Sequence, residues 1–224
     1  MRIVVRIGGS VVASPVDSVL IAQYVDLLKK IKKQGHEVVA VVGGGVLARD
    51  FIKVAGELEL DESSRDWVAI FASRLVSLLF VMCLAKEGCG AVPVSLDEVV
   101  GFLKHGKIVV MGGLKPGMTT DAVGALVAKK VKAELLVKAT DQDGICNRDP
   151  KKYPDAKKID RLGFDDLHRL FEMDKHEAGI HQILDPEAIR ILQKSRTKTV
   201  VVNGVKPRNV LWAVKGKKVG TIIR

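Results

Sequence analysis

The chain has 224 residues, of which 47% are hydrophobic and 28% are charged, a globular composition that excludes a disordered chain or a fibrous repeat. The formal net charge of +10 favours anionic ligands such as nucleotides, phosphates or nucleic acid. Aromatic residues make up only 4%, too few for a surface on which nucleic-acid bases stack. The composition therefore favours small phosphorylated ligands and argues against a nucleic-acid partner.

The number and spacing of the cysteines indicate the redox state of the cellular compartment. Cys83, Cys89 and Cys146 form no C-x-x-C pair and indicate no disulfide framework, which favours a reducing cytoplasm over secretion. Met1 leads directly into a strand-like run, so no targeting segment is expected. We therefore expect a cytoplasmic protein.

The first half of the chain alternates between strand-like and helix-like segments. In chain order, the patterns predict a strand over 3–7, a helix over 17–33, a strand over 38–42, a helix over 46–57 and a long helix over 67–85. Asp17 or Ser18 is the expected N-cap of the first of these helices, and Gly35 is its stop signal.

The long apolar stretch 67–85 resembles a membrane span in length. Arg74 lies near its middle, where a charge costs about 2.5–3.5 kcal/mol on insertion scales. A helix that is apolar almost all round is also what a deep core or a subunit interface requires. We expect this helix to be buried in a soluble protein, with no membrane partner, and residues 69–85 to pack at a subunit interface.

The second half of the chain continues the alternation of strands and helices, and its composition then changes. The patterns predict strands over 92–94 and 107–111 around a turn or helix at 96–104, then a helix over 119–132 and a strand over 135–139. Residues 141–163 are rich in Asp, Lys and Pro and read as an irregular surface segment. Helices at 164–171 and 186–195, the latter capped by Asp185, and strands at 199–202 and 219–223 complete the chain. This order predicts an α/β sandwich around a largely parallel sheet.

Three glycine-rich elements follow predicted strands and lead toward helices. They are Gly8-Gly9-Ser10, Gly43-Gly44-Gly45, and the segment 112–121. The carboxyl ends of parallel strands share one edge of a sheet, and glycine lets backbone N–H groups approach phosphate oxygens there. Each element alone could be a plain turn, but the three together predict a phosphate-binding edge.

Two familiar nucleotide-binding motifs almost match this sequence. Gly43-x-Gly45-x-x-Ala48 satisfies the loose dinucleotide pattern, but Glu62 and Asp66 precede a helix where that pattern needs an acid at a strand end. The segment 112–119 resembles a Walker loop in which methionine replaces the essential lysine. Neither motif is therefore satisfied.

Nearly end to end, the chain resembles the amino-acid kinase family and, within it, the archaeal uridylate (UMP) kinases. The resemblance rests on the motifs Ile7-Gly8-Gly9-Ser10-Val11, Val42-Gly43-Gly44-Gly45-x-Leu47-Ala48-Arg49, Met111-Gly112-Gly113-x-x-Pro116-Gly117-x-Thr119-Thr120-Asp121 and Thr140-x-x-Asp143-Gly144-Ile145. It implies a three-layer αβα sandwich in one domain over 1–224. The acceptor-side lobe would cover about residues 1–135 and the ATP-side lobe about residues 136–224.

The resemblance also implies an activity, the ATP-dependent phosphorylation of UMP to UDP in pyrimidine biosynthesis, and a set of site residues. The implied catalytic residues are Arg6, Ser10 and Asp121. The implied ATP-binding residues are Gly9, Ser10, Gly45, Arg49, Thr140, Cys146 and Asp149. The implied UMP-binding residues are Gly44, Asp66, Leu114, Lys115, Pro116, Gly117, Met118, Thr119 and Thr120. Mg²⁺ would accompany ATP, held mainly by phosphates with no metal-ligating residue, and the assembly would be a homohexamer built as a trimer of dimers.

Three segments depart from the family pattern. Arg6 stands where many relatives have lysine, Ser73-Arg74-Leu75-Val76-Ser77 replaces Thr-Arg-x-Asn-Ala, and Asp141-Gln142-Asp143-Gly144-Ile145-Cys146 lacks the usual final aromatic. Two alternatives to UMP kinase activity therefore stay open. The chain could phosphorylate another small phosphate, carboxylate or carbamate acceptor, or it could bind nucleotides or oxyanions without turnover.

Overall fold

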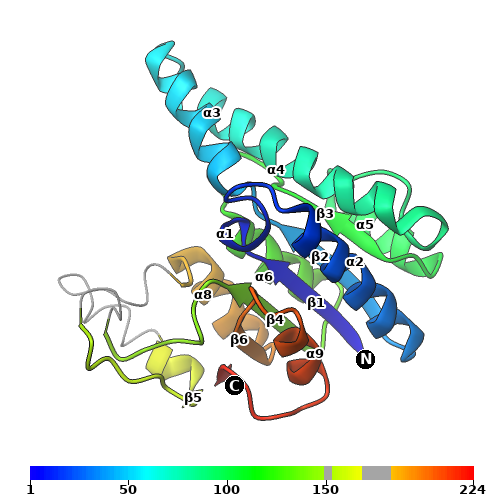
Figure 1. Ribbon diagram of the computed structural model, residues 1–224, viewed down its shortest axis with the longest axis vertical. Helices are drawn as coiled ribbons and strands as arrows, with labels where there is room; N and C mark the ends of the chain where they lie inside the picture. Colours follow the sequence, from blue (N-terminus) through cyan, green and yellow to red (C-terminus); the bar gives the residue numbers. More distant parts are fainter. Residues whose placement is uncertain (149–152, 168–182) are drawn as a thin grey trace.

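A seven-stranded sheet organises the part of the chain that the structure describes, a computed structural model covering residues 1–148, 153–167 and 183–224 (Figure 1). The strand order is β3-β2-β1-β4-β6-β7-β5. The strands are β1 (Arg2–Ile7), β2 (Glu37–Val42), β3 (Val109–Met111), β4 (Leu135–Thr140), β5 (Arg161–Leu162), β6 (Thr199–Asn203) and β7 (Thr221–Ile223). The pairs between neighbouring strands are parallel except β6–β7, which is antiparallel, so the expected largely parallel sheet is confirmed.

Strand β1 lies where the direction of winding reverses. The chain builds outward on one side through β2 and β3, and then returns to place β4 on the other side of β1. Open α/β sheets bind ligands in the crevice at the carboxyl ends of the strands beside such a reversal. In the β1–β4 register Arg6 is the partner of Lys138, and this pairing places two cations at that crevice.

Helices cover both faces of the sheet and make the predicted three layers (Figure 1). Helices α2, α4 and α9 pack on one face, and α5, α6 and α8 on the other, while α3 packs against α4. Their bounds are α1 (Gly9–Val12), α2 (Ser18–Lys33), α3 (Gly45–Glu57), α4 (Glu62–Leu84), α5 (Leu96–Lys104), α6 (Thr120–Lys130), α8 (Pro186–Ser195) and α9 (Arg208–Val214), with a 3₁₀ turn η1 (Ala85–Glu87).

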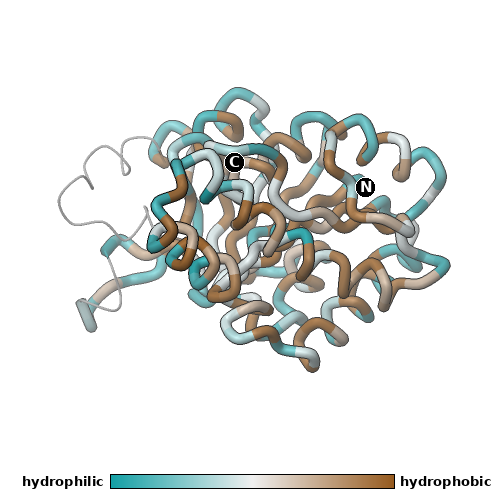
Figure 2. Tube along the Cα trace, turned by 90° about the horizontal axis from the view of Figure 1, so that it is seen from above, coloured by the Kyte–Doolittle hydropathy of each residue, from teal (hydrophilic) through white to brown (hydrophobic). Residues whose placement is uncertain are grey.

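The core consists mainly of aliphatic side chains on both faces of the central strands. Every residue of β4 is buried, and so are five of the six residues of β2. Figure 2 shows hydrophobic residues mainly in the inner segments of the chain and hydrophilic ones mainly in the outer turns. Such continuous apolar runs are expected for parallel strands that are covered on both sides. Lys138 is the exception, because it is a charged residue inside a buried strand.

Most predicted elements are confirmed, but the strand predicted over 92–94 is wrong. Pro93 has no backbone N–H, and the N–H of Val94 donates to Glu98 Oε2 at 3.0 Å. Ser95 is the N-cap of α5 and accepts from the N–H of Glu98, so residues 92–94 lead into the capped start of α5 instead of forming a strand.

The other differences between the sequence prediction and the structure concern short helices and strands. Helices α1 and α9 and the two-residue β5 were not predicted, because each is too short to show a clear period. Residues 164–167 are helical, and the remainder of the helix predicted over 164–171 lies outside the described residues. Asp17 caps α2 and Asp185 caps α8, as expected, through bonds to the backbone nitrogens of Leu20 and Ala188.

Helix α4 is buried on one face and exposed on the other in this single chain, so its expected packing at a subunit interface stays a prediction. Phe80 and Leu84 are buried against the core, whereas Phe71 is 62% exposed and Met82 is 58% exposed. The stretch Glu62–Glu87 is long and apolar enough to cross a membrane by length and composition alone. Core helices of soluble proteins pass the same test, so this property does not distinguish the two.

Candidate active site

The turns after β1 and β2 interlock at the carboxyl edge of the sheet. A Cβ atom added to Gly9 would lie 2.1 Å from the backbone nitrogen of Gly45. Gly45 has a φ of 60°, and a Cβ atom there would lie 2.0 Å from the carbonyl oxygen of Ala13. No residue with a side chain fits either position without moving the backbone, so glycine is required for the two turns to meet.

A cavity of about 310 Å³ opens above these turns, and we call it the polar cavity because charged and hydrogen-bonding groups dominate its lining. It is lined by Arg6, Gly9, Ser10, Gly43, Gly44, Gly45, Arg49, Thr120, Asp121, Lys138, Thr140, Asp141 and Gln142. These residues come from β1, from β4 and the turn after it, from the two glycine turns, and from the first turns of α3 and α6, which all meet at the carboxyl edge of the sheet.

Three charged side chains form the base of the polar cavity. Arg6 Nε lies 2.7 Å from Asp121 Oδ1, and Lys138 Nζ forms an ion pair with Asp121 Oδ2. Arg6 Nη2 also donates to Thr120 Oγ1 at 2.8 Å. The carboxylate of Asp121 thereby joins two neighbouring strands to the start of α6, and its two oxygens are occupied by the two cations.

Burial changes the ionisation of this cluster. It lowers the pKa of Lys138 from 10.5 to about 8, although Asp121 opposes the shift. Burial alone would raise the pKa of Asp121, but Arg6 and Lys138 together hold that pKa below its ordinary value. At neutral pH the cluster therefore carries two positive charges and one negative charge, and Arg49 adds a third cation to the lining. Such a cavity favours anionic ligands.

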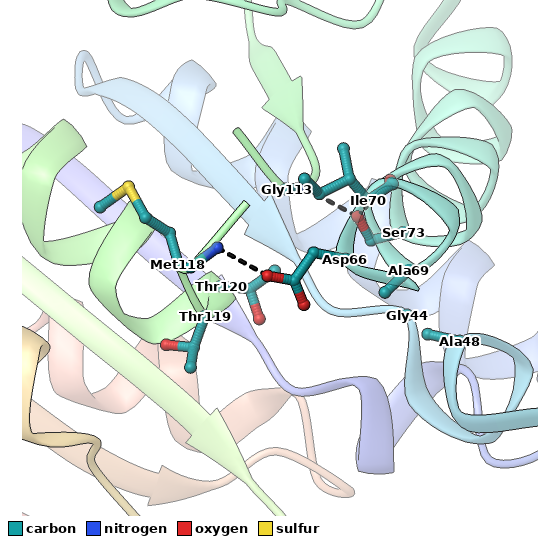
Figure 3. A pocket seen from close by; sticks show the side chains of 11 residues that line it. Gly44, Ala48, Asp66, Ala69, Ile70, Ser73, Gly113, Met118, Thr119 and Thr120 are labelled. Carbon is teal, nitrogen blue, oxygen red and sulfur yellow. Dashed lines mark hydrogen bonds between the residues drawn. The ribbon is translucent and has the colours of Figure 1, made fainter. Parts of the chain in front are cut away.

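A second cavity of about 340 Å³ adjoins the first, and we call it the side cavity (Figure 3). It is lined by Gly44, Ala48, Asp66, Ala69, Ile70, Ser73, Gly113, Gly117, Met118, Thr119 and Thr120. Gly44 and Thr120 line both cavities, so ligands in the two would lie next to each other. Asp66 Oδ2 accepts a hydrogen bond from the backbone N–H of Gly117 at 2.7 Å.

The structure brings most of the predicted site residues together in the two expected groups. The polar cavity contains Arg6, Gly9, Ser10, Gly45, Arg49, Asp121 and Thr140. The side cavity contains Gly44, Asp66, Gly117, Met118, Thr119 and Thr120. Their binding roles stay predictions.

Four predicted residues that the structure describes line neither cavity, and a fifth is not described. Leu114, Lys115 and Pro116 lie in the loop before the side cavity, and Cys146 lies in a segment that bridges to Lys158. Asp149 lies outside the described residues.

Lys138 is the most important residue that the sequence reading missed. Its signal was present, since a single lysine interrupts the buried run Leu135–Thr140 near the carboxyl end of the strand. A charged side chain at such a position needs a partner, and the partner here is Asp121. Asp141 and Gln142 in the polar cavity and Ser73 and Gly113 in the side cavity were likewise not predicted as site residues.

A family model described as the amino acid kinase family matches residues 1–203. The chain belongs to the amino acid kinase family. Among its members, the uridylate kinase of Methanocaldococcus jannaschii is 41% identical over 100% of this chain and 99% of its own length. The family resemblance found in the sequence is thus confirmed.

Solved structures of the family agree with the fold described above. The crystal structure of uridylate kinase from Archaeoglobus fulgidus matches with a TM-score of 0.91 at 37% identity and covers 100% of both chains. The UMP kinase from Bacillus anthracis matches with a TM-score of 0.84 at 23% identity, covering 100% of this chain and 95% of its own, and this likeness shows the fold alone. The expected αβα architecture is confirmed.

The charged cluster generates a stability prediction. The variant Asp121→Asn leaves Arg6 and Lys138 close together in a buried site without their carboxylate partner, so the free energy of unfolding at pH 7 should fall by about 3 kcal/mol. Urea denaturation measures this change. Asp97→Asn is the matched control, because it breaks an exposed Asp97–Lys130 ion pair of 2.8 Å and should leave the midpoint unchanged. Equal midpoints for the two variants would contradict the cluster's structural role.

Proposed function

We propose that this chain is a uridylate kinase, which transfers the γ-phosphoryl group of ATP to UMP and gives ADP and UDP. The observation that carries the proposal is the pair of adjoining cavities, one cationic and one with a carboxylate and a loop of backbone amides, which share Gly44 and Thr120. Phosphoryl transfer needs two phosphates side by side in a positively charged environment. The full-length similarity to proteins named uridylate kinase supports UMP as the acceptor.

The polar cavity would hold the phosphates of ATP. The glycine turns at Gly9 and Gly45 allow close approach of a ligand to the backbone, and Ser10 and Arg49 add a hydroxyl and a guanidinium. Arg6 and Lys138 lie at the base of the cavity and would neutralise charge on the transferring group. Asp121 would act by positioning these two cations, since both of its oxygens face them.

The side cavity would hold UMP. Asp66 would accept hydrogen bonds from ribose hydroxyl groups, which a carboxylate does well. Gly117 to Thr120 would surround the α-phosphate and the base, and Thr120 lies between this cavity and Arg6. The attacking group is a phosphate oxygen that is already largely anionic at neutral pH, so the transfer requires no protein nucleophile or general base.

Mg²⁺ would enter as the partner of ATP. Among the described residues, no group of three His, Cys, Asp or Glu side chains gathers in a way that could hold a metal ion. Of the two carboxylates that line the polar cavity, Asp121 and Asp141, the first is paired with Arg6 and Lys138. These features fit an ion bound mainly by nucleotide phosphates, where its charge would help to neutralise the transferring group.

The wider biological setting follows from this proposal. UDP formation would place the enzyme in pyrimidine nucleotide synthesis in the cytoplasm, with no nucleic-acid or membrane partner. An acceptor lobe over about residues 1–135 and an ATP lobe over about residues 136–224 would meet within the polar cavity, which draws Gly9 and Arg49 from the first and Thr140 from the second.

A homohexamer built from dimers is the proposed assembly. Exposed apolar side chains gather on the α3–α4 pair, and a second copy that covers them would form the dimer. These side chains are Phe51, Ile52, Val54 and Leu58 on α3 and its end, and Trp67, Phe71, Leu75, Leu78, Leu79 and Met82 on α4.

An acceptor panel tests the proposed activity. UMP should be phosphorylated at least about a hundredfold more efficiently than CMP, AMP or GMP, because a site that hydrogen-bonds one base edge leaves polar groups unpaired with the others. Asp66→Asn should raise KM for UMP more than KM for ATP. ADP formation with each acceptor is the measurement. Equal rates across the panel, turnover only with a carboxylate or carbamate, or nucleotide binding without turnover would refute the uridylate kinase proposal.

The buried lysine predicts a pH dependence. Protonated Lys138 attracts phosphate and neutral Lys138 does not, so kcat/KM for ATP should decline through a midpoint near pH 8 and fall about tenfold per unit well above it. Both substrates are fully ionised in this range and add no dependence of their own. Lys138→Met should have a low kcat/KM that stays flat over the same range. A flat profile for the natural protein up to pH 9.5 would contradict the assignment.

The assembly prediction is tested by mass in solution. Light scattering at micromolar concentration should give about six times the chain mass of 24.3 kDa. Leu75→Glu, at a position 56% exposed on α4, should give smaller species because it places a charge in the proposed interface. Val19→Glu, at a position 63% exposed on α2, is the matched control and should keep the full mass. A fully active monomer would overturn the proposed assembly.

A further inference from the structure

Consecutive residues of α4 hold both backbone groups of one glycine in the loop after β3. The N–H of Gly113 donates to Ser73 Oγ at 2.8 Å, and its carbonyl oxygen accepts from Arg74 Nε at 3.0 Å (the first of these bonds is drawn in Figure 3). Arg74 Nη2 donates to the next carbonyl, that of Leu114, at 3.1 Å. The guanidinium of Arg74 therefore bonds two successive peptide groups with two of its nitrogens.

The position of this guanidinium is set by two aromatic rings on its own helix. The central carbon of the guanidinium lies 5.9 Å from the ring centroid of Trp67 and 5.7 Å from that of Phe71. The rings attract the cation and restrict where it can lie, while its N–H groups point to the loop. A lysine in this place offers one compact ammonium group and lacks the planar fork that reaches two carbonyls at once.

The loop lies directly against α4. A Cβ atom added to Gly113 would come within 2.9 Å of Ile70 Cγ1, so the close approach depends on glycine. Further along the loop, the N–H of Gly117 bonds to Asp66 on the same helix. Residues 113–117 are thus bonded to α4 at both ends, and both end residues, Gly113 and Gly117, line the side cavity.

We propose that Arg74 is a positioning residue for the acceptor: it fixes the carbonyls of Gly113 and Leu114 and thereby sets the shape of the side cavity. Arg74 itself lines neither described cavity, so its effect passes through the loop. The identity of the acceptor as UMP rests on the proposed function. The polar cavity shares none of the loop residues 113–117, so the affinity for ATP is independent of Arg74.

Steady-state kinetics of Arg74→Lys and Arg74→Ala test the proposal. Because two hydrogen bonds from a charged group hold the loop, both variants should raise KM for UMP about tenfold and leave KM for ATP within about twofold. Arg74→Lys keeps the positive charge. A raised KM for UMP in this variant would therefore show that the two hydrogen bonds of the guanidinium, and not its charge alone, position the loop. Full recovery in Arg74→Lys would overturn the proposal.

Hydrogen exchange of the ligand-free protein gives a second readout that does not depend on the acceptor's identity. The amides of Leu114, Lys115, Gly117 and Met118 should exchange faster in both Arg74 variants, while those of β1 and β4 keep their rates. Arg65→Lys is the matched control, since Arg65 also lies on α4 and its Nε donates to a carbonyl, that of Leu60, at 2.7 Å. This control should change neither exchange in the loop nor KM for UMP.

The two readouts separate the two claims. If the natural protein does not turn over UMP but the loop amides exchange faster in the Arg74 variants, the proposed function fails and the positioning role stands. If UMP is a good substrate and either the exchange rates or KM for UMP stay at the values of the natural protein in both Arg74 variants, the positioning role is overturned and the proposed function stands.

Discussion

Two cations on adjacent strands, Arg6 on β1 and Lys138 on β4, share one carboxylate on the first turn of α6. This cluster depends on the reversal of winding at β1, which makes β1 and β4 neighbours and leaves a crevice at their carboxyl ends. Asp121 offsets the repulsion between the cations and keeps them directed toward the polar cavity. The same carboxylate therefore stabilises the fold and maintains the positive charge on which phosphate binding would depend.

Helix α4 has three faces with different contacts: one packs into the core, one bonds to the loop beside the side cavity, and one is exposed. Phe80 packs into the core, Asp66 and Arg74 bond to the loop that borders the side cavity, and Phe71 is exposed beside Arg74. One helix thus contributes to the stability of the sheet, to the shape of the proposed acceptor site and to the proposed subunit interface. A change on the exposed face would reach the loop through the aromatic rings that hold Arg74.

Much of the fold and a large part of the site follow from the sequence because their signals are local. Apolar runs mark β1, β2 and β4, and glycine turns after strands mark the edge where the cavities lie. What the sequence reading missed depends on contacts between distant residues. Lys138 acquires its role from Asp121, 17 positions away, and Arg74 from carbonyls 39 and 40 positions away. The strand predicted at 92–94 failed because the capping bonds of α5 use the amide of Val94.

The most direct test is a crystal structure with UMP and a non-hydrolysable ATP analogue bound together. We predict an arrangement in which the γ-phosphate lies beside Arg6 and Lys138, the UMP phosphate lies beside Gly44 and Thr120, and the uridine ribose contacts Asp66. It would be contradicted by a structure in which the polar cavity holds no nucleotide phosphate, or in which UMP binds away from the loop between Gly113 and Thr120.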